Sequence, residues 1–184
     1  MAFDPAHLDV AAFTRAGAHV DGRLSQAGLT RLAASTQALA DGSAQEVEWS
    51  AQGLQTESGG GQADTRLHLV VRTSVHRTCQ RCLQPVAEPL VVDRTFRFVV
   101  GDDEAARLDE ELEEDVLALP RRLDLVALIE DELILALPIV PMHETCPAPL
   151  PPYAEASADV DGGVEERSNP FAVLAALKKG RPGG

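Results

Sequence analysis

Two pairs of potential metal ligands lie far apart in the sequence, Cys79 with Cys82 and His143 with Cys146. Within each pair two residues separate the ligands, a spacing that lets both side chains of one turn reach the same ion. Thiolate sulfur and imidazole nitrogen are the ligands of tetrahedral Zn²⁺. The four side chains therefore predict a structural zinc site, in which the ion stabilises the folded chain over the unfolded one.

Two other interpretations use the same cysteines. A redox-active C-x-x-C opens a helix in a βαβ unit, whereas here Gln84-Pro85-Val86 leads into a predicted strand. Three cysteines are an odd number, which argues against a closed disulfide framework. Reduced thiols without an ion fit the pattern as well as zinc does, and metal analysis with Cys79→Ser as the control decides between the two.

The second ligand pair follows a stretch with the apolar spacing of a helix. Its main apolar positions recur every four residues and form one buried face: Leu125, Ile129, Leu133 and Leu137. Pro138 ends this helix, because a proline disfavours helical backbone in the residue before it.

A second apolar ridge, Leu128 and Leu135, lies beside the polar positions Asp124 and Asp131. A helix that is apolar on two sides is either enclosed by the fold or contacts another molecule. Leu128 and Leu135 are therefore candidate partner-binding residues.

The first ligand pair lies between two predicted strands. Apolar and polar residues alternate over three stretches, which is typical of half-buried strands: 45–52, 67–75 and 90–100. An edge strand at 18–24, a helix at 29–39 and a short strand at 116–119 complete the pattern. We predict an α+β fold, with an antiparallel sheet packed against the central amphipathic helix and an extended C-terminal tail that ends in a short helix.

The run 102–115 consists mostly of carboxylates. It lacks the fixed ligand offsets of a calcium or magnesium loop, and we interpret it as a solvated connector. An RNA-processing enzyme would need these carboxylates to converge on a pocket. No nucleophile–base set or phosphate-binding loop is recognisable in the sequence, so we expect no catalytic residues.

The formal net charge of −13 disfavours non-specific RNA binding over most of the surface. Direct RNA contact would need a local basic patch, and the candidates are Arg66, Arg72, Arg77 and Arg81. For Arg66 and Arg72 we favour cross-strand pairing with Glu46 and Glu48 instead.

Composition divides the chain into three parts. Residues 1–146 form the predicted α+β domain, 147–168 a flexible linker rich in proline and acidic residues, and 169–184 a short helix and tail. The last helix carries a small apolar face of Phe171, Leu174 and Leu177. A helix this short is marginal alone, so it docks either on a partner, which we favour, or on its own domain.

The N-terminal residues show no signal-peptide pattern, and no uncharged apolar segment is long enough to span a bilayer. Cytoplasm, without membrane association, is the expected location.

Three blocks of sequence, TCQRCLQP, DLVALIEDELILALPIVPMH and NPFAVLAALK, together resemble the YceD family of large ribosomal RNA subunit accumulation proteins. The resemblance covers 78–85, 124–146 and 169–178. It implies a non-catalytic role in the synthesis, processing or stability of 23S ribosomal RNA. We expect this role to be indirect, through a protein of ribosome assembly; direct contact with pre-23S RNA ranks second, and an RNA-processing enzyme third.

Overall fold

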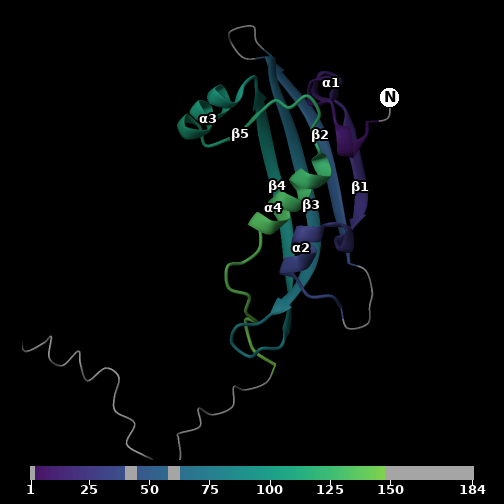
Figure 1. The fold of residues 1–184 in the computed structure, drawn as a ribbon, viewed down its shortest axis with the longest axis vertical. Coiled ribbons are helices and arrows are strands. Elements are labelled where there is room, and N and C mark those ends of the chain that lie inside the picture. Colours follow the sequence, from purple (N-terminus) through teal and green to yellow (C-terminus); the bar gives the residue numbers. More distant parts are fainter. Residues whose placement is uncertain (1–2, 40–44, 58–62, 148–184) are drawn as a thin grey trace, which may run out of the picture. The chain divides into compact units, whose positions relative to one another are not determined.

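The computed structural model describes residues 3–39, 45–57 and 63–147. Its centre is one five-stranded sheet of order β1-β2-β3-β4-β5, in which β1 to β4 are antiparallel and β5 runs parallel to β4 (Figure 1). The strands are β1 His19–Ser25, β2 Glu46–Glu57, β3 Ala63–Thr78, β4 Pro85–Val99 and β5 Asp115–Ala118. The α+β prediction is confirmed, with a mixed rather than purely antiparallel sheet. The predicted linker and the C-terminal helix with Phe171, Leu174 and Leu177 lie outside the described residues.

The predicted alternation places the core on one face of this sheet. Leu67 of β3 lies opposite Phe96 of β4, and Val71 lies opposite both Trp49 of β2 and Val92 of β4. All the inward positions expected in 45–52 and 67–75 are buried. Val100, also expected to face inward, is 80% exposed, because β4 ends at Val99 and Gly101 turns the chain away with φ of 93°.

The central helix, α4 Leu125–Leu135, covers this apolar face (Figure 1). Asp124 caps its first turn by accepting a hydrogen bond from the backbone N–H of Ala127 at 3.0 Å. Leu125, Ile129 and Leu133 are fully buried, as their four-residue spacing predicts. The second ridge is not enclosed by the described residues: Leu135 remains 73% exposed.

Short helices flank α4 on the core side of the sheet: η1 Pro5–His7, α1 Val10–Arg15, η2 Gln26–Gly28 and α2 Thr30–Ser35. The sequence analysis did not predict α1, and α2 is shorter than the predicted helix 29–39. The α1 helix packs directly on β2 at Gly53, where a Cβ atom would lie 2.7 Å from both the Phe13 carbonyl oxygen and the Thr14 Cα. Only glycine permits this contact between two backbones.

We expect Gly53→Ala to lower the free energy of unfolding by about 2 kcal/mol, because backbone atoms of α1 cannot move aside as a flexible side chain could. Urea denaturation measures this. Gly28→Ala is the matched control, since a Cβ atom there meets nothing within 4 Å, and its effect should stay within about 0.5 kcal/mol. Equal losses for the two variants would contradict the tight packing of α1 on β2.

The predicted solvated connector at 102–115 is wrong in its first part, because Asp102–Glu111 forms the helix α3 beside β5. Asp102, Asp103 and Glu104 occupy its first turn, where carboxylates interact favourably with the helix dipole. Further along, Arg107 links Glu104 and Glu111 through ion pairs of 2.7 and 2.8 Å. Local charge pairing therefore stabilises a helix that has few apolar residues and buries only Ala105.

Candidate metal centre

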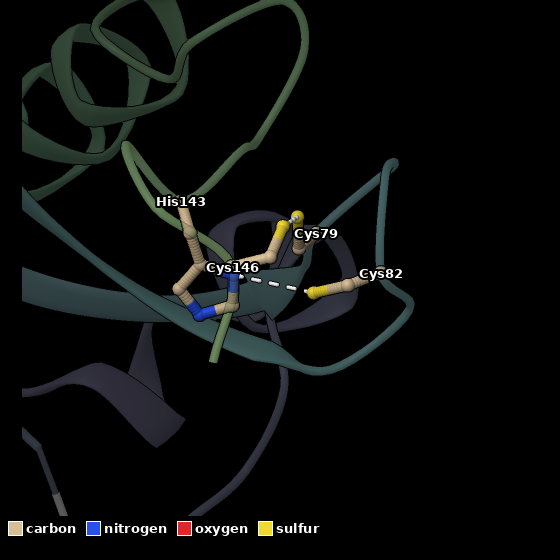
Figure 2. A group of neighbouring side chains, drawn as sticks. All are labelled: Cys79, Cys82, His143 and Cys146. Carbon is tan, nitrogen blue, oxygen red and sulfur yellow. Dashed lines mark hydrogen bonds between the residues drawn. The ribbon is translucent and has the colours of Figure 1, made fainter. Parts of the chain in front are cut away.

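The turn between β3 and β4 holds the first pair of predicted ligands. The backbone N–H of Cys79 donates to the Gln84 carbonyl oxygen, and that of Leu83 donates to the Cys79 carbonyl oxygen, both at 2.9 Å. Leu83 adopts a φ of +60°, in the left-handed region that closes tight turns. This compact turn places Cys79 and Cys82 on the same side of the hairpin tip (Figure 2).

The loop that leaves α4 brings the second pair to the same tip. The Gln80 backbone N–H donates to the Pro141 carbonyl oxygen at 2.9 Å, and the Arg77 guanidinium donates to the Pro138 carbonyl oxygen at 2.6 Å. These bonds fix the loop against the β3–β4 hairpin. His143 and Cys146 then point towards the two hairpin cysteines (Figure 2).

The four predicted ligands converge into one cluster. Their ligand atoms all lie within 4.8 Å of one another, and no other such group of histidine, cysteine or acidic residues exists in the described part of the chain. The Sγ atoms of Cys79 and Cys146 are 4.0 Å apart, and Cys82 Sγ lies 3.4 Å from His143 Nδ1. A tetrahedral zinc site requires edges of about 3.8 Å between sulfurs and about 3.6 Å between sulfur and nitrogen. The residues therefore fit this ion.

The imidazole of His143 is held in the orientation that a ligand needs. Its Nε2 lies 3.0 Å from the Pro85 carbonyl oxygen, which can only accept a hydrogen bond. The proton is therefore assigned to Nε2, and the lone pair of Nδ1 faces the cysteines. A second hydrogen bond of this kind is typical of metal-binding histidines, because it fixes both the tautomer and the ring.

Arg81 supplies positive charge to the cluster. Its Nε donates to Cys146 Sγ at 3.0 Å, and one terminal nitrogen donates to the His143 and Glu144 carbonyl oxygens at 2.6 and 3.3 Å. Three thiolates and one neutral histidine around a dication leave a net charge of −1, which the guanidinium compensates. The sequence analysis considered Arg81 only for RNA contact; its place in a C-x-x-C turn was the signal that could have indicated this second role.

The environment also favours a thiolate at Cys79. Burial raises the pKa of this thiol, but backbone N–H groups of Cys82, His143 and Arg81 and the His143 side chain outweigh burial and lower the pKa to about 5. At Cys82 burial dominates and raises the pKa, and the neighbouring sulfurs of Cys146 and Cys79 raise it further. A dication between the sulfurs would remove this repulsion between like charges.

The family comparison covers the whole cluster. Residues 67–178 match the family model described as "Large ribosomal RNA subunit accumulation protein YceD". The chain belongs to the YceD family. The matched region runs from β3 to beyond α4, so all four candidate ligands lie inside it.

A curated YceD relative from Haemophilus influenzae, named "Large ribosomal RNA subunit accumulation protein YceD", is 36% identical over 109 residues. The alignment covers 59% of this chain and 63% of the relative, which is less than two thirds of that protein's length. No solved structure matches the chain.

In this YceD-family chain the four arginines proposed for RNA contact do not form one patch. Arg66 and Arg77 stand near opposite ends of β3, about 36 Å apart at the rise of a strand. Arg66 contacts Asp64 at 3.5 Å and Glu114 at 2.9 Å, and Arg77 contacts Glu88 at 3.5 Å. Arg81 contacts Cys146 in the cluster of candidate metal ligands.

Arg72 lies opposite Glu48 in the β2–β3 register, and within the described residues it has no ion pair. The predicted pairing with Glu46 and Glu48 is wrong for Arg66, which contacts Asp64 and Glu114 instead. Arg72 does lie opposite Glu48, but the ion pairs of Glu46 and Glu48 are with Arg23 of the edge strand, at 3.3 and 2.9 Å. β1 is the neighbour of β2 on the side opposite to β3, and in its register Arg23 lies directly opposite Glu48.

No helix in the described parts of the chain is long and apolar enough to cross a membrane.

Proposed function

We propose that this chain supports the accumulation of 23S ribosomal RNA as a non-catalytic factor that acts through a protein partner. The family membership supports 23S ribosomal RNA as the molecule whose level the chain affects, because the family is named for accumulation of the large-subunit ribosomal RNA. The family is not named for a reaction. The expected location is the cytoplasm, where ribosomal subunits of bacteria are assembled.

The exposed ridge of α4 is the observation that carries the protein-partner mechanism. Leu135 is 73% exposed although it belongs to the helix that organises the core. Contiguous exposed apolar surface, in contrast to a single exposed side chain, indicates a protein-binding site. Leu128, half-buried, lies two turns earlier on the same ridge and extends it.

The distribution of charge supports a protein over RNA as the direct partner. The chain has a formal net charge of −13, and a polyanion such as RNA is repelled by an acidic surface. Arg66, Arg77 and Arg81 already contact groups within the chain. Only Arg72 of the four candidates offers its charge to solvent without an ion pair among the described residues.

We further propose that Cys79, Cys82, His143 and Cys146 hold zinc as a structural ion. The four ligand types, the edge lengths and the hydrogen bond from His143 to Pro85 support this choice. A closed set of four protein ligands leaves no position for a substrate, so the ion would join the hairpin tip to the loop after α4. It would thereby hold the C-terminal end of the ridge in place.

Deletion of the gene should lower the ratio of 23S to 16S ribosomal RNA, and the full chain expressed from a plasmid should restore it. Northern blotting or quantitative sequencing of total RNA measures the ratio. An unchanged ratio after deletion would contradict the proposed role.

The proposal that the chain does not cleave RNA is tested separately, with purified protein and precursor 23S RNA in the presence of magnesium. We expect no cleavage. RNA affinity that falls steeply with added salt and is abolished by Arg72→Gln would instead favour direct RNA binding.

A further inference from the structure

A groove of about 720 Å³ lies between α4 and the paired strands β4 and β5. Its apolar part is formed by Leu128, Ile134 and Leu135 of α4 together with Leu117 of β5. Figure 1 shows α4 lying across the sheet, with β5 and α3 to one side of it. Both residues of the exposed ridge therefore line a single depression.

Carboxylates surround this apolar strip in excess over arginines. Four line the groove, namely Asp109, Asp115, Asp131 and Glu132, against only Arg31 and Arg94. Arg94 contacts Asp115 at 3.0 Å and Glu132 at 3.3 Å, and Arg31 pairs with Asp131 and Glu130. Each guanidinium thus forms ion pairs with two carboxylates. Because four carboxylates and two guanidinium groups line the groove, its lining carries a net negative charge.

Glu132 is the most buried of the four carboxylates that line the groove. Its side chain is 8% exposed, and its carboxylate contacts Arg94 alone among the described ion pairs. Burial raises its pKa; Arg94 opposes this, while Asp115 and Asp131 add to it. An additional cation in the groove would lower the free energy of the ionised carboxylate.

The shape and charge together restrict the occupant. An apolar strip beside a helix accepts the apolar face of another helix, whose anchors recur at i, i+3, i+4 and i+7. The surrounding carboxylates favour lysine and arginine on both sides of those anchors and repel both RNA and acidic peptides.

We propose that the groove between α4 and β5 binds a basic amphipathic helix of a protein partner. This inference rests on the proposed function, because it states the chemistry of the partner through which the chain acts. Leu135 and Leu128 contact the apolar anchors of that helix, and Asp131, Asp115 and Glu132 contact its lysine or arginine side chains.

A synthetic peptide tests the site without knowledge of the natural partner. The probe is a helix of about 18 residues with leucine at i, i+3, i+7 and i+10 and lysine at the flanking positions. A control peptide carries glutamate in place of every lysine. We expect the full-length chain to bind the lysine peptide at least tenfold more tightly than the glutamate peptide, with an affinity that falls as salt is added.

Two variants locate the binding. Leu135→Ser should weaken binding of the lysine peptide about tenfold, since it removes a large apolar contact. Ile139→Ser is the matched control: its side chain is 97% exposed and lies outside the groove lining, so binding should not change. Both positions are solvent-exposed, so neither change endangers folding.

Several results would overturn the proposal: equal affinity for the two peptides, equal losses for Leu135→Ser and Ile139→Ser, or binding of an RNA oligonucleotide to the chain, without peptide, that Leu135→Ser abolishes. Tighter peptide binding by the full chain carrying Phe171→Asp would assign the groove to the chain's own C-terminal segment, and would also overturn a partner helix as its occupant.

Measuring 23S ribosomal RNA with the same variants separates this proposal from the proposed function. Suppose that the Leu135→Ser chain no longer binds the peptide but fully restores the level of 23S RNA when it is expressed in the deletion strain. The groove is then not the site through which the chain acts, while its proposed role in 23S RNA accumulation is unaffected. If deletion itself leaves 23S RNA unchanged, the proposed function fails whatever the peptide does.

Discussion

Removal of the proposed zinc ion should lower the thermal midpoint of unfolding by about 10 °C, the largest effect expected for any single change in this protein. An ion at a thousandfold excess over its dissociation constant stabilises the fold by about 4 kcal/mol, and about 1 kcal/mol corresponds to roughly 2–4 °C in a chain of this size. Cys79→Ser should have the same effect, because this fully buried side chain is at the centre of the cluster.

Elemental analysis of the purified chain, combined with thermal unfolding monitored by circular dichroism, checks this prediction. We expect one zinc ion per wild-type chain and less than a tenth of that in Cys79→Ser. Thr145→Ser, a change next to Cys146 that removes no ligand, should keep both the zinc and the midpoint. A midpoint that is the same with and without metal would contradict the structural role of the site.

Glu130→Gln should cost about 3 kcal/mol of the free energy of unfolding. The carboxylate of Glu130 is 8% exposed and accepts hydrogen bonds from the backbone N–H of Arg31 at 2.7 Å, that of Leu32 at 3.2 Å and Arg31 Nε at 2.9 Å. The N-cap residue of α2, Leu29, has no side-chain acceptor. Glu130 of α4 therefore caps α2 from outside, and a neutral amide replaces these three charge-assisted bonds poorly.

The pH dependence of stability follows from the same contacts. Burial raises the pKa of Glu130, but the N–H groups of Leu32 and Arg31 and the Arg31 guanidinium outweigh burial and lower the pKa below its ordinary value. The stabilisation is therefore complete above the unfolded pKa of about 4.3. It is lost as the pH falls through the lower folded pKa, and Glu130→Gln should remove that loss.

Glu132→Gln is the matched control for Glu130→Gln, two positions along the same helix. Burial raises the pKa of Glu132 above its ordinary value, so its charge costs stability at neutral pH and the cost disappears as the pH falls towards the unfolded pKa. Glu132→Gln should be neutral or stabilising at pH 7. Urea denaturation between pH 7 and about pH 3 compares the two variants, since the predicted loss for Glu130 lies below its unfolded pKa. Equal losses at pH 7 would contradict the assigned roles.

Local periodicity carried most of the information about the fold. Alternation over 67–75 predicted which side chains of β3 are buried, because successive residues of a strand face opposite sides of the sheet. The four-residue spacing of Leu125, Ile129 and Leu133 predicted the buried face of α4 for the corresponding reason in a helix. Both signals depend only on neighbouring residues.

The elements that the sequence did not predict are stabilised by other forces. Ion pairs of Arg107 stabilise α3, which buries only Ala105, and α1 is a six-residue helix held by packing on β2. The parallel pairing of β5 with β4 depends on contacts between distant residues, and so does the capping of α2 by Glu130. No local pattern contains these contacts.

The candidate metal cluster was predictable as a set of four residues, because few side chains bind zinc and their spacing within each turn is restricted. The geometry that makes it a site was not predictable. The hydrogen bond from His143 to Pro85 and the contact of Arg81 with Cys146 both join the β3–β4 hairpin to the loop after α4. These contacts require the folded sheet and helix to be in place.

The most direct test of the account is affinity purification of the tagged full-length chain from cells, with and without nuclease treatment, beside the Leu135→Ser and Ile139→Ser variants. We predict that basic proteins of the large ribosomal subunit or its assembly co-purify with the wild type and Ile139→Ser after nuclease treatment, and that Leu135→Ser loses them. Recovery of nucleic acid alone, with every protein lost after nuclease, would contradict a protein-mediated role.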